Sequence, residues 1–243
     1  MTMQTSSHPR APAPDRPSPV ADIPTGRYQA FLFDMDGTIL NSIASAERIW
    51  GRWALSHGLD LAAFLPTMHG ARAVDTVTRL GLPGVDAQAE ADAITRAEIV
   101  DTDGIVEVAG AARFLATLPP GRWTIVTSAP RELAIGRLNA AGLPIPATMV
   151  TADDVGAGKP RPDCYLLAAS RLGVAPATCL VFEDAHVGIA AGVAAGAQVV
   201  VVTATHAQPM ATPHASIVDY TGLSVNVGEA EGGWLSLSLA GAD

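Results

Sequence analysis

The amino-acid sequence predicts an α/β fold, in which a doubly wound parallel-sheet core carries an inserted all-helical cap domain. Three observations support this prediction. Short apolar runs without polar alternation recur along the chain, as expected for strands that are covered on both faces. Helical patterns separate most of these runs, which is typical of strand–helix–strand units in a parallel sheet. The stretch of about 44–107, between the first and second runs, contains helical patterns only.

The predicted strands are short and consist mainly of β-branched and other apolar residues. The first run ends abruptly at Asp34, and the fourth ends just before Glu183. Because the runs lack a polar residue at every second position, both faces of the sheet are expected to be buried. The five predicted strands are 28–33, 124–126, 148–150, 179–182 and 198–202.

The helices of the predicted core are marked by their ends. One helical pattern follows Pro130 and stops before Gly142, and the next begins at Pro162 and stops before Gly173. Proline is favoured in the first turn of a helix and glycine just after the last turn. These two helices therefore connect consecutive strands of the core.

The stretch 44–107 carries three helical patterns and no strand candidate. The first pattern has Trp50 and Trp53 at helical spacing, which indicates packing inside the helical domain. The second covers about 74–80 and the third about 91–97. We therefore expect a discontinuous core domain, 28–43 and 108–227, interrupted by a helical cap domain, 44–107.

The two ends of the chain have a different composition. Residues 1–27 are rich in Pro, Ser and Ala and lack the apolar run of a signal peptide, so we expect a disordered leader. Residues 228–243 are rich in Gly and Ser, and we expect a flexible tail there.

Composition excludes several classes of protein. Hydrophobic residues make up 49% of the chain, which is ample for a buried core, and the formal net charge is −9. An acidic chain lacks the basic face that binds nucleic acid, and no apolar window approaches the roughly 18 residues of a membrane span. The two cysteines, Cys164 and Cys179, are too few for a disulfide framework. We expect a cytoplasmic monomer that binds neither nucleic acid nor membrane.

Chemically active side chains follow the predicted strands. In open α/β sheets, ligands bind at the carboxyl ends of the strands, so these side chains are expected to meet at one edge. Lys159 is the only lysine of the chain. The candidate groups, in chain order, are Asp34, Asp36, Thr127, Ser128, Lys159, Glu183 and Asp184.

The carboxylates of this set predict a metal site. Asp34, Asp184 and Glu183 would bring like charges into one small space, and burying them without a partner is costly. A hard dication would compensate them, and a set of oxygen ligands favours Mg²⁺.

The remaining groups predict phosphoryl transfer. Together with the metal, Lys159 and Thr127 would hold the oxygens of a phosphate, and Asp34 could then attack phosphorus to form an aspartyl-phosphate. Asp36 lies in a turn loosened by Gly37, from which it could protonate the leaving oxygen and later deprotonate water.

Four segments of the chain resemble, in order, the four motifs of the haloacid dehalogenase superfamily. The segments are Asp34-Met35-Asp36-Gly37-Thr38, Val126-Thr127-Ser128, Gly158-Lys159-Pro160 and Glu183-Asp184-Ala185. The resemblance covers about 28–225, and the helical insertion is similar to that of the subgroup with a helical (C1-type) cap.

The resemblance implies a role for each motif residue. It makes Asp34 the nucleophile and a metal ligand, Asp36 the general acid and base that offers its backbone carbonyl to the metal, and Asp184 a metal ligand. Thr127 and Lys159 would hold the phosphoryl group. Two assignments remain open: Ser128 could replace Thr127 as the phosphate-binding hydroxyl, and Glu183 is either a second acidic ligand or a partner outside the ligand set.

Asp36 and the cap loop narrow the implied reaction. Dehalogenases of the superfamily lack the second aspartate of the first motif, whereas its phosphatases and mutases keep it. The loop His69-Gly70-Ala71-Arg72 resembles that of the sugar- and polyol-phosphate phosphatases, including the glycerol-phosphate and 2-deoxyglucose-phosphate types. The resemblance therefore implies that His69, Gly70 and Arg72 bind the substrate.

We therefore expect a Mg²⁺-dependent phosphomonoesterase that hydrolyses a small sugar or polyol phosphate. The alternatives are a mutase similar to the β-phosphoglucomutases, which carry an arginine where Ala73 stands here, and a phosphoglycolate phosphatase-like hydrolase. Plainer interpretations are that Asp34 and Asp36 are turn residues and that Arg72 is a helix-surface partner of Asp75.

Overall fold

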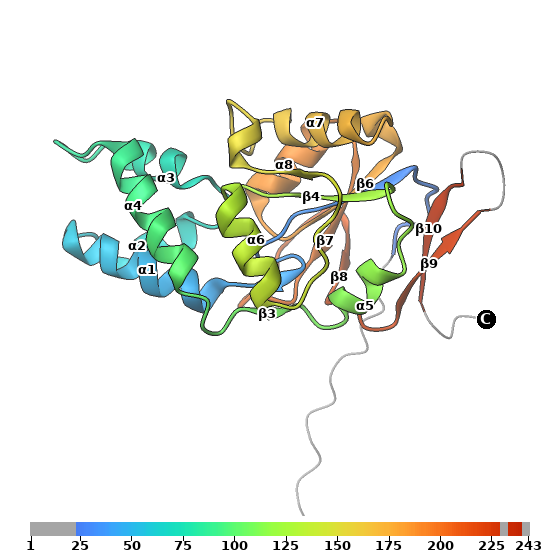
Figure 1. Ribbon diagram of the computed structural model, residues 1–243, viewed down its shortest axis with the longest axis horizontal. Coiled ribbons are helices and arrows are strands. Elements are labelled where there is room, and N and C mark those ends of the chain that lie inside the picture. The colour runs from blue at the N-terminus through green and yellow to red at the C-terminus, as the bar shows by residue number, and fades with distance from the viewer. Residues whose placement is uncertain (1–22, 229–232, 240–243) are drawn as a thin grey trace, which may run out of the picture.

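The computed structural model describes residues 23–228 and 233–239, and it confirms the predicted fold class. Six strands form one sheet in the order β5-β4-β1-β6-β7-β8, and every neighbouring pair is parallel. The strands are β1 (Ala30–Phe33), β4 (Trp123–Val126), β5 (Met149–Val150), β6 (Cys179–Glu183), β7 (Gln198–Val202) and β8 (Ala215–Ile217). Figure 1 shows the overall arrangement of helices and strands.

Helices cover both faces of this sheet. Phe31 and Phe33 point to one face and pack with Phe114 of α5 (Ala111–Ala116), while Leu32 points to the other and packs with Tyr165 of α7 (Asp163–Arg171). This alternation follows from the period of two in a strand. The other helical segments of the core are α6 (Arg131–Ala140), α8 (His186–Ala194) and the short 3₁₀ turns η2 (Ala152–Asp154) and η3 (Pro176–Thr178).

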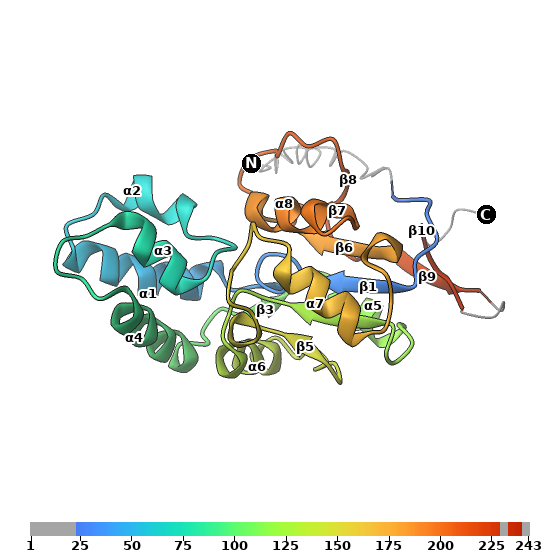
Figure 2. The same cartoon turned by 90° about the horizontal axis from the view of Figure 1, so that it is seen from above.

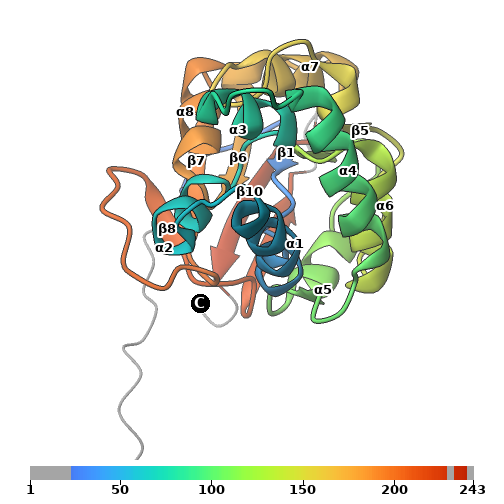
Figure 3. The same cartoon turned by 90° about the vertical axis from the view of Figure 1, so that its left-hand side faces the viewer.

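A separate group of helices lies beside the carboxyl ends of the strands (Figures 2 and 3). It comprises α1 (Ile43–Ser56), α2 (Leu61–Phe64), η1 (Leu65–Thr67), α3 (Ala73–Leu80) and α4 (Ala87–Val100), and is called the cap below. The cap has an apolar cluster of its own, in which Trp50 and Trp53 pack against Phe64. Its helices therefore stabilise one another independently of the sheet.

Two short strands join the cap to the core, contrary to the expectation that 44–107 holds no strand. β2 (Leu40–Asn41) pairs antiparallel with β3 (Val106–Glu107), so the chain enters and leaves the cap at one place. The sequence pattern missed β3 because it is two residues long and both side chains are exposed. β8 was also missed.

The expectation of a flexible tail is wrong for residues 235–239. There β10 (Leu235–Leu239) pairs antiparallel with β9 (Leu223–Val227), and Leu235 and Leu237 are buried. Their alternation with serine is the pattern of a strand with one buried face, which the Gly- and Ser-rich composition obscured. Of the expected leader, residues 1–22 lie outside the described residues.

Within 23–228 and 233–239, no helix has the length and hydropathy required to cross a membrane.

Candidate active site

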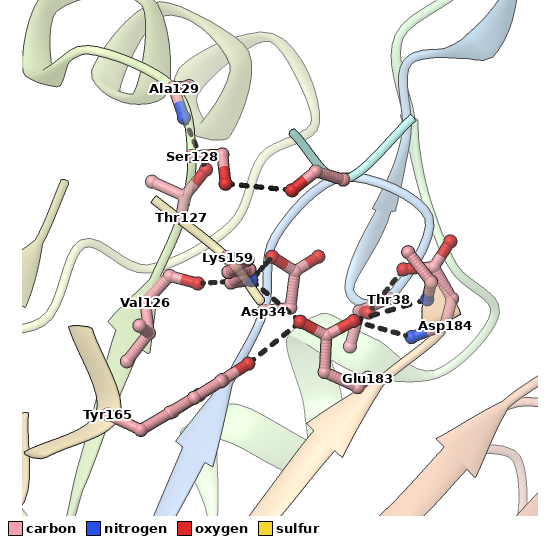
Figure 4. Close-up of polar contacts among 12 residues, drawn as sticks. Asp34, Thr38, Val126, Thr127, Ser128, Ala129, Lys159, Tyr165, Glu183 and Asp184 are labelled. Carbon is pink, nitrogen blue, oxygen red and sulfur yellow. Dashed lines mark hydrogen bonds and ion pairs between the residues drawn. The ribbon is translucent and has the colours of Figure 1, made fainter. Parts of the chain in front are cut away.

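The centre of the site is an ion pair between the end of β1 and the loop before α7. Asp34 directly follows β1, and its Oδ1 lies 2.5 Å from Nζ of Lys159 (Figure 4). Lys159 also donates to Oε1 of Glu183 at 2.6 Å and to the carbonyl of Val126 at 3.3 Å. Its side chain is 1% exposed. The only lysine of the chain is thus a buried cation between two carboxylates.

Glu183, the last residue of β6, is held by four donors. Oε1 accepts from Lys159 and from the hydroxyl of Tyr165 at 2.8 Å, and Oε2 accepts from the backbone N–H groups of Asp184 at 3.0 Å and Ala185 at 3.2 Å. Gly188 leaves room for this carboxylate, because a Cβ there would lie 1.7 Å from Oε1. These four hydrogen bonds hold the Glu183 carboxylate in one position.

Three carboxylates lie close enough to share one ion. Oxygens of Asp34, Glu183 and Asp184 all lie within 4.8 Å of one another. Thr38 donates to Oδ1 of Asp184 at 3.0 Å. Gly37 has a φ of 87°, and a Cβ there would lie 2.0 Å from Oδ2 of Asp184, so only glycine admits this approach. Three carboxylates against one lysine leave excess negative charge, and this all-oxygen set fits a hard dication.

The charges of the site shift one another's proton affinity. Burial and the charge of Glu183 raise the pKa of Asp34 to about 7, although Lys159 opposes the shift. Burial and Asp34 likewise raise the pKa of Asp184 well above its usual range. Burial alone would lower the pKa of Lys159, but Asp34 and Glu183 raise it instead. Without a further cation, the lysine therefore does not compensate the carboxylates fully.

Asp36 lies in the turn after β1 and has two partners of its own. Its Oδ1 accepts from the hydroxyl of Ser42 at 2.6 Å and from Nη1 of Arg137 at 2.9 Å. Nη2 of Arg137 donates to Oε1 of Glu98 at 2.9 Å. Sequence reasoning missed Ser42, Arg137 and Glu98.

The hydroxyls after β4 have different partners. Oγ1 of Thr127 accepts from the N–H of Ala129 at 3.0 Å, so its own hydrogen remains available to a ligand. Ser128 instead donates its hydroxyl hydrogen to the carbonyl of Gly70 in the cap at 2.8 Å (Figure 4).

A cavity of about 80 Å³ lies between core and cap. Both aspartates of the first motif reach it, as do the hydroxyl residues after β4 and three residues of the cap loop. The residues from the predicted site that line it are Asp34, Asp36, Thr127, Ser128, His69 and Gly70. Lys159, Glu183 and Asp184 do not line this cavity, although Lys159 contacts Asp34 and the two acids belong to the same cluster as Asp34.

The cap loop sits tightly on the core. Gly70 has a φ of 76°, and a Cβ there would lie 2.7 Å from Cβ of Ala185. Arg72 faces away from the 80 Å³ cavity: its Nε and Nη2 bind the carboxylate of Asp75 at 2.7 and 2.8 Å, and Nη1 binds the carbonyls of Val155 and Gly156. In this arrangement Arg72 joins the cap to the core. His69 lies 3.7 Å from Glu47.

Comparison with known proteins agrees with this geometry. The family model of the haloacid dehalogenase-like hydrolases matches residues 28–196. Hexitol phosphatase A of Escherichia coli (strain K12) is 41% identical over 197 residues, covering 79% of this chain and 89% of that protein. Validoxylamine A 7'-phosphate phosphatase of Streptomyces hygroscopicus subsp. limoneus is 35% identical over 203 residues, covering 80% and 95%. A solved hydrolase structure from Pseudomonas syringae has a TM-score of 0.65 and 28% identity, covering 74% and 87%.

Proposed function

This chain belongs to the haloacid dehalogenase-like hydrolases, and from that premise we propose that it is a Mg²⁺-dependent phosphatase of a small sugar or polyol phosphate. The observation that carries the proposal is the pair Asp34 and Asp36, whose carboxylates line one cavity between core and cap. The Asp34 carboxylate is bound to the buried Lys159 beside a cluster of acids, and its side chain is 6% exposed. The Asp36 side chain is more exposed, at 28%. Two such environments suit a nucleophile and a proton carrier.

Asp34 and Asp36 divide the reaction between them. Asp34 attacks phosphorus and forms an aspartyl-phosphate, while Asp36 gives a proton to the departing oxygen of the alcohol. Asp36, now a carboxylate, then takes a proton from the water that attacks the aspartyl-phosphate, which releases inorganic phosphate and restores the Asp34 carboxylate and the protonated Asp36. A bound Mg²⁺, held by Asp34, Asp184 and the backbone carbonyl of Asp36, would neutralise charge on the phosphoryl oxygens.

The phosphoryl group is held by Lys159 and Thr127. Lys159 supplies positive charge beside Asp34, and Thr127 has a free hydroxyl hydrogen at the cavity wall. Because Ser128 already donates to Gly70, Thr127 is the better donor to phosphate. Glu183 acts outside the ligand set, since both of its oxygens already accept hydrogen bonds from the protein.

The charges of the cavity favour a neutral leaving group. The described residues that line it include the carboxylates of Asp34, Asp36 and Glu98 and one arginine, Arg137, which already binds two of these carboxylates. A second phosphate or a carboxylate on the substrate would therefore meet acidic groups without a free arginine. This supports a sugar or polyol monophosphate over a phosphoglycolate or a mutase's bisphosphate. The two named phosphatases that resemble this chain act, by their names, on hexitol and validoxylamine phosphates.

Phosphate release over a panel of substrates tests the proposal. The panel contains hexitol, glycerol, hexose, pentose and glycolate phosphates with Mg²⁺, and Asp34→Asn serves as the blank. We expect release from a sugar or polyol phosphate by the wild type and none by the variant. Release from glycolate phosphate alone, or only isomerisation of a hexose 1-phosphate after its bisphosphate is added, would overturn the substrate class.

A further inference from the structure

We propose that Arg137 is a positioning residue for the general acid and base Asp36, and that Glu98 of the cap sets how Arg137 holds it. The inference rests on the proposed function, because it assigns a task to Asp36 in that reaction. Asp36 then reaches its working geometry for proton transfer only while the cap is docked on the core.

Arg137 contacts Asp36 directly. Arg137 projects from α6 of the core, and its side chain is 7% exposed. Nη1 donates to Oδ1 of Asp36 at 2.9 Å. An arginine keeps its charge at every working pH, so this donor is always available. A guanidinium packed this tightly has one orientation, which fixes the carboxylate that it binds.

Only one oxygen of the Asp36 carboxylate accepts hydrogen bonds from the described residues. The hydroxyl of Ser42 also donates to Oδ1, at 2.6 Å, so both protein donors converge on the same oxygen. Among the described residues, no donor binds Oδ2. The carboxylate is therefore held by one oxygen, while Oδ2 is left to carry the proton to and from the reacting groups.

Glu98, which belongs to α4 of the cap, binds the other end of the Arg137 guanidinium. Its side chain is also 7% exposed, and its Oε1 accepts from Nη2 of Arg137 at 2.9 Å. Arginine and a carboxylate prefer to form two parallel hydrogen bonds. With Nη2 turned to Glu98, Arg137 makes one hydrogen bond to Asp36 in this arrangement, from Nη1.

It follows that cap docking and proton transfer are linked. When the cap lifts, Glu98 leaves the guanidinium, and both of its terminal nitrogens can then bind both oxygens of Asp36. Oδ2 is blocked in that state. With the cap docked, as Gly70 against Ala185 and Ser128 at the Gly70 carbonyl show here, Oδ2 is free. The enzyme would therefore protonate a leaving group only inside the closed cavity.

The test uses the dependence of the first chemical step on the leaving group. The value of kcat/KM covers all steps up to departure of the alcohol. A polyol phosphate needs a proton on its leaving oxygen, whereas p-nitrophenyl phosphate has a stable leaving anion and hardly needs one. A loss of acid positioning therefore lowers kcat/KM for the polyol phosphate much more than for the aryl phosphate, and a general loss of structure lowers both alike.

Four variants and one control are measured. In Arg137→Met and Glu98→Ala we expect kcat/KM to fall about 30-fold or more for the polyol phosphate, which is part of the roughly 10²–10⁴-fold that general acid catalysis contributes. For the aryl phosphate we expect a fall of less than about 3-fold. Glu98→Gln keeps an acceptor for Nη2 and should recover most of the loss. The double variant Arg137→Met with Glu98→Met replaces both members of the buried ion pair and leaves no unpaired charge. It should therefore stay folded even if Arg137→Met alone unfolds. Arg131→Met, on the same helix but paired with Asp154, should leave both values unchanged.

The outcomes separate this inference from the function on which it rests. The wild type and Asp36→Asn are measured first: if Asp36→Asn loses the polyol phosphate selectively, the role of Asp36 stands. Equal losses on both substrates in the Arg137 and Glu98 variants, or none, would then overturn the inference alone. No hydrolysis by the wild type would overturn the proposed function, and the inference with it.

Discussion

Lys159→Met removes the only cation that contacts Asp34 and Glu183 within 23–228 and 233–239, and it is expected to destabilise the metal-free protein strongly. Nζ makes two charged hydrogen bonds, at 2.5 and 2.6 Å, and its side chain is 1% exposed, so water does not screen them. Removing one partner of a buried ion pair costs about 3–5 kcal/mol. That is a large part of the roughly 5–15 kcal/mol by which a domain is stable.

Urea unfolding in the presence of a chelator measures this loss. With a slope of about 2 kcal/mol per molar urea, the midpoint should fall by about 2 M. Tyr165→Phe is the matched comparison, because it removes one neutral donor from the same Glu183 carboxylate, and we expect a loss of about 1–2 kcal/mol. Saturating Mg²⁺ should return part of the stability to Lys159→Met, since a dication replaces the lost charge.

A small loss of stability in Lys159→Met would contradict this role of the ion pair. If Lys159→Met loses less than about 1 kcal/mol, the carboxylates are not held together by the lysine. If its stability does not respond to Mg²⁺, the acidic cluster is not a cation site. A loss equal to that of Tyr165→Phe would show that the charge on Nζ adds nothing beyond a hydrogen bond.

Three further predictions concern the same site. Gly188→Ala should lower stability by about 3 kcal/mol or more in urea unfolding, because its Cβ would displace the Glu183 carboxylate from four donors; an unchanged midpoint would contradict this. Gly70→Ala should reduce kcat/KM by about tenfold or more, because its Cβ meets Ala185 when the cap docks, and its positive φ should cost a further ~1–2 kcal/mol of stability in urea unfolding; an unchanged kcat/KM would contradict this. The metal-free protein should lose about 4 kcal/mol of stability as pH rises from about 4 to about 7. The reason is that the pKa of Asp34 is about 7 in the folded state, so folding takes up a proton in that pH range. Mg²⁺ favours the ionised carboxylate and should therefore reduce the pH dependence of stability, which urea unfolding at each pH measures.

The strand-end residues could be predicted from the sequence because topology alone brings them together. Asp34 and Glu183 each sit at the carboxyl end of a parallel strand, and neighbouring parallel strands end at one edge of the sheet. Lys159 was identifiable as the single lysine in a strand-end loop. These features depend on strand order and spacing, which apolar runs and the motif order reveal.

Arg137 and Glu98 could not be predicted in the same way. Each occupies a helix position that, in sequence, looks like an ordinary charged surface residue, and they meet only because α4 of the cap docks on α6 of the core. In the cap loop, the pairing of Arg72 with Asp75 was one of the alternatives that helical spacing offered, and the structure shows it. The contacts of Arg72 with core carbonyls could not be predicted. The docking of one domain on another depends on three-dimensional packing that periodicity does not encode.

The central claim, that Asp34 carries the phosphoryl group, is tested most directly by trapping that group. The wild type is mixed with Mg²⁺ and its preferred sugar or polyol phosphate, quenched in acid within the first turnover, digested and analysed by mass spectrometry. We expect a phosphoryl group on the peptide that contains Asp34, and neither this adduct nor phosphate release in Asp34→Asn. Turnover by Asp34→Asn above background, or a phosphoryl group on a different residue, would contradict the mechanism.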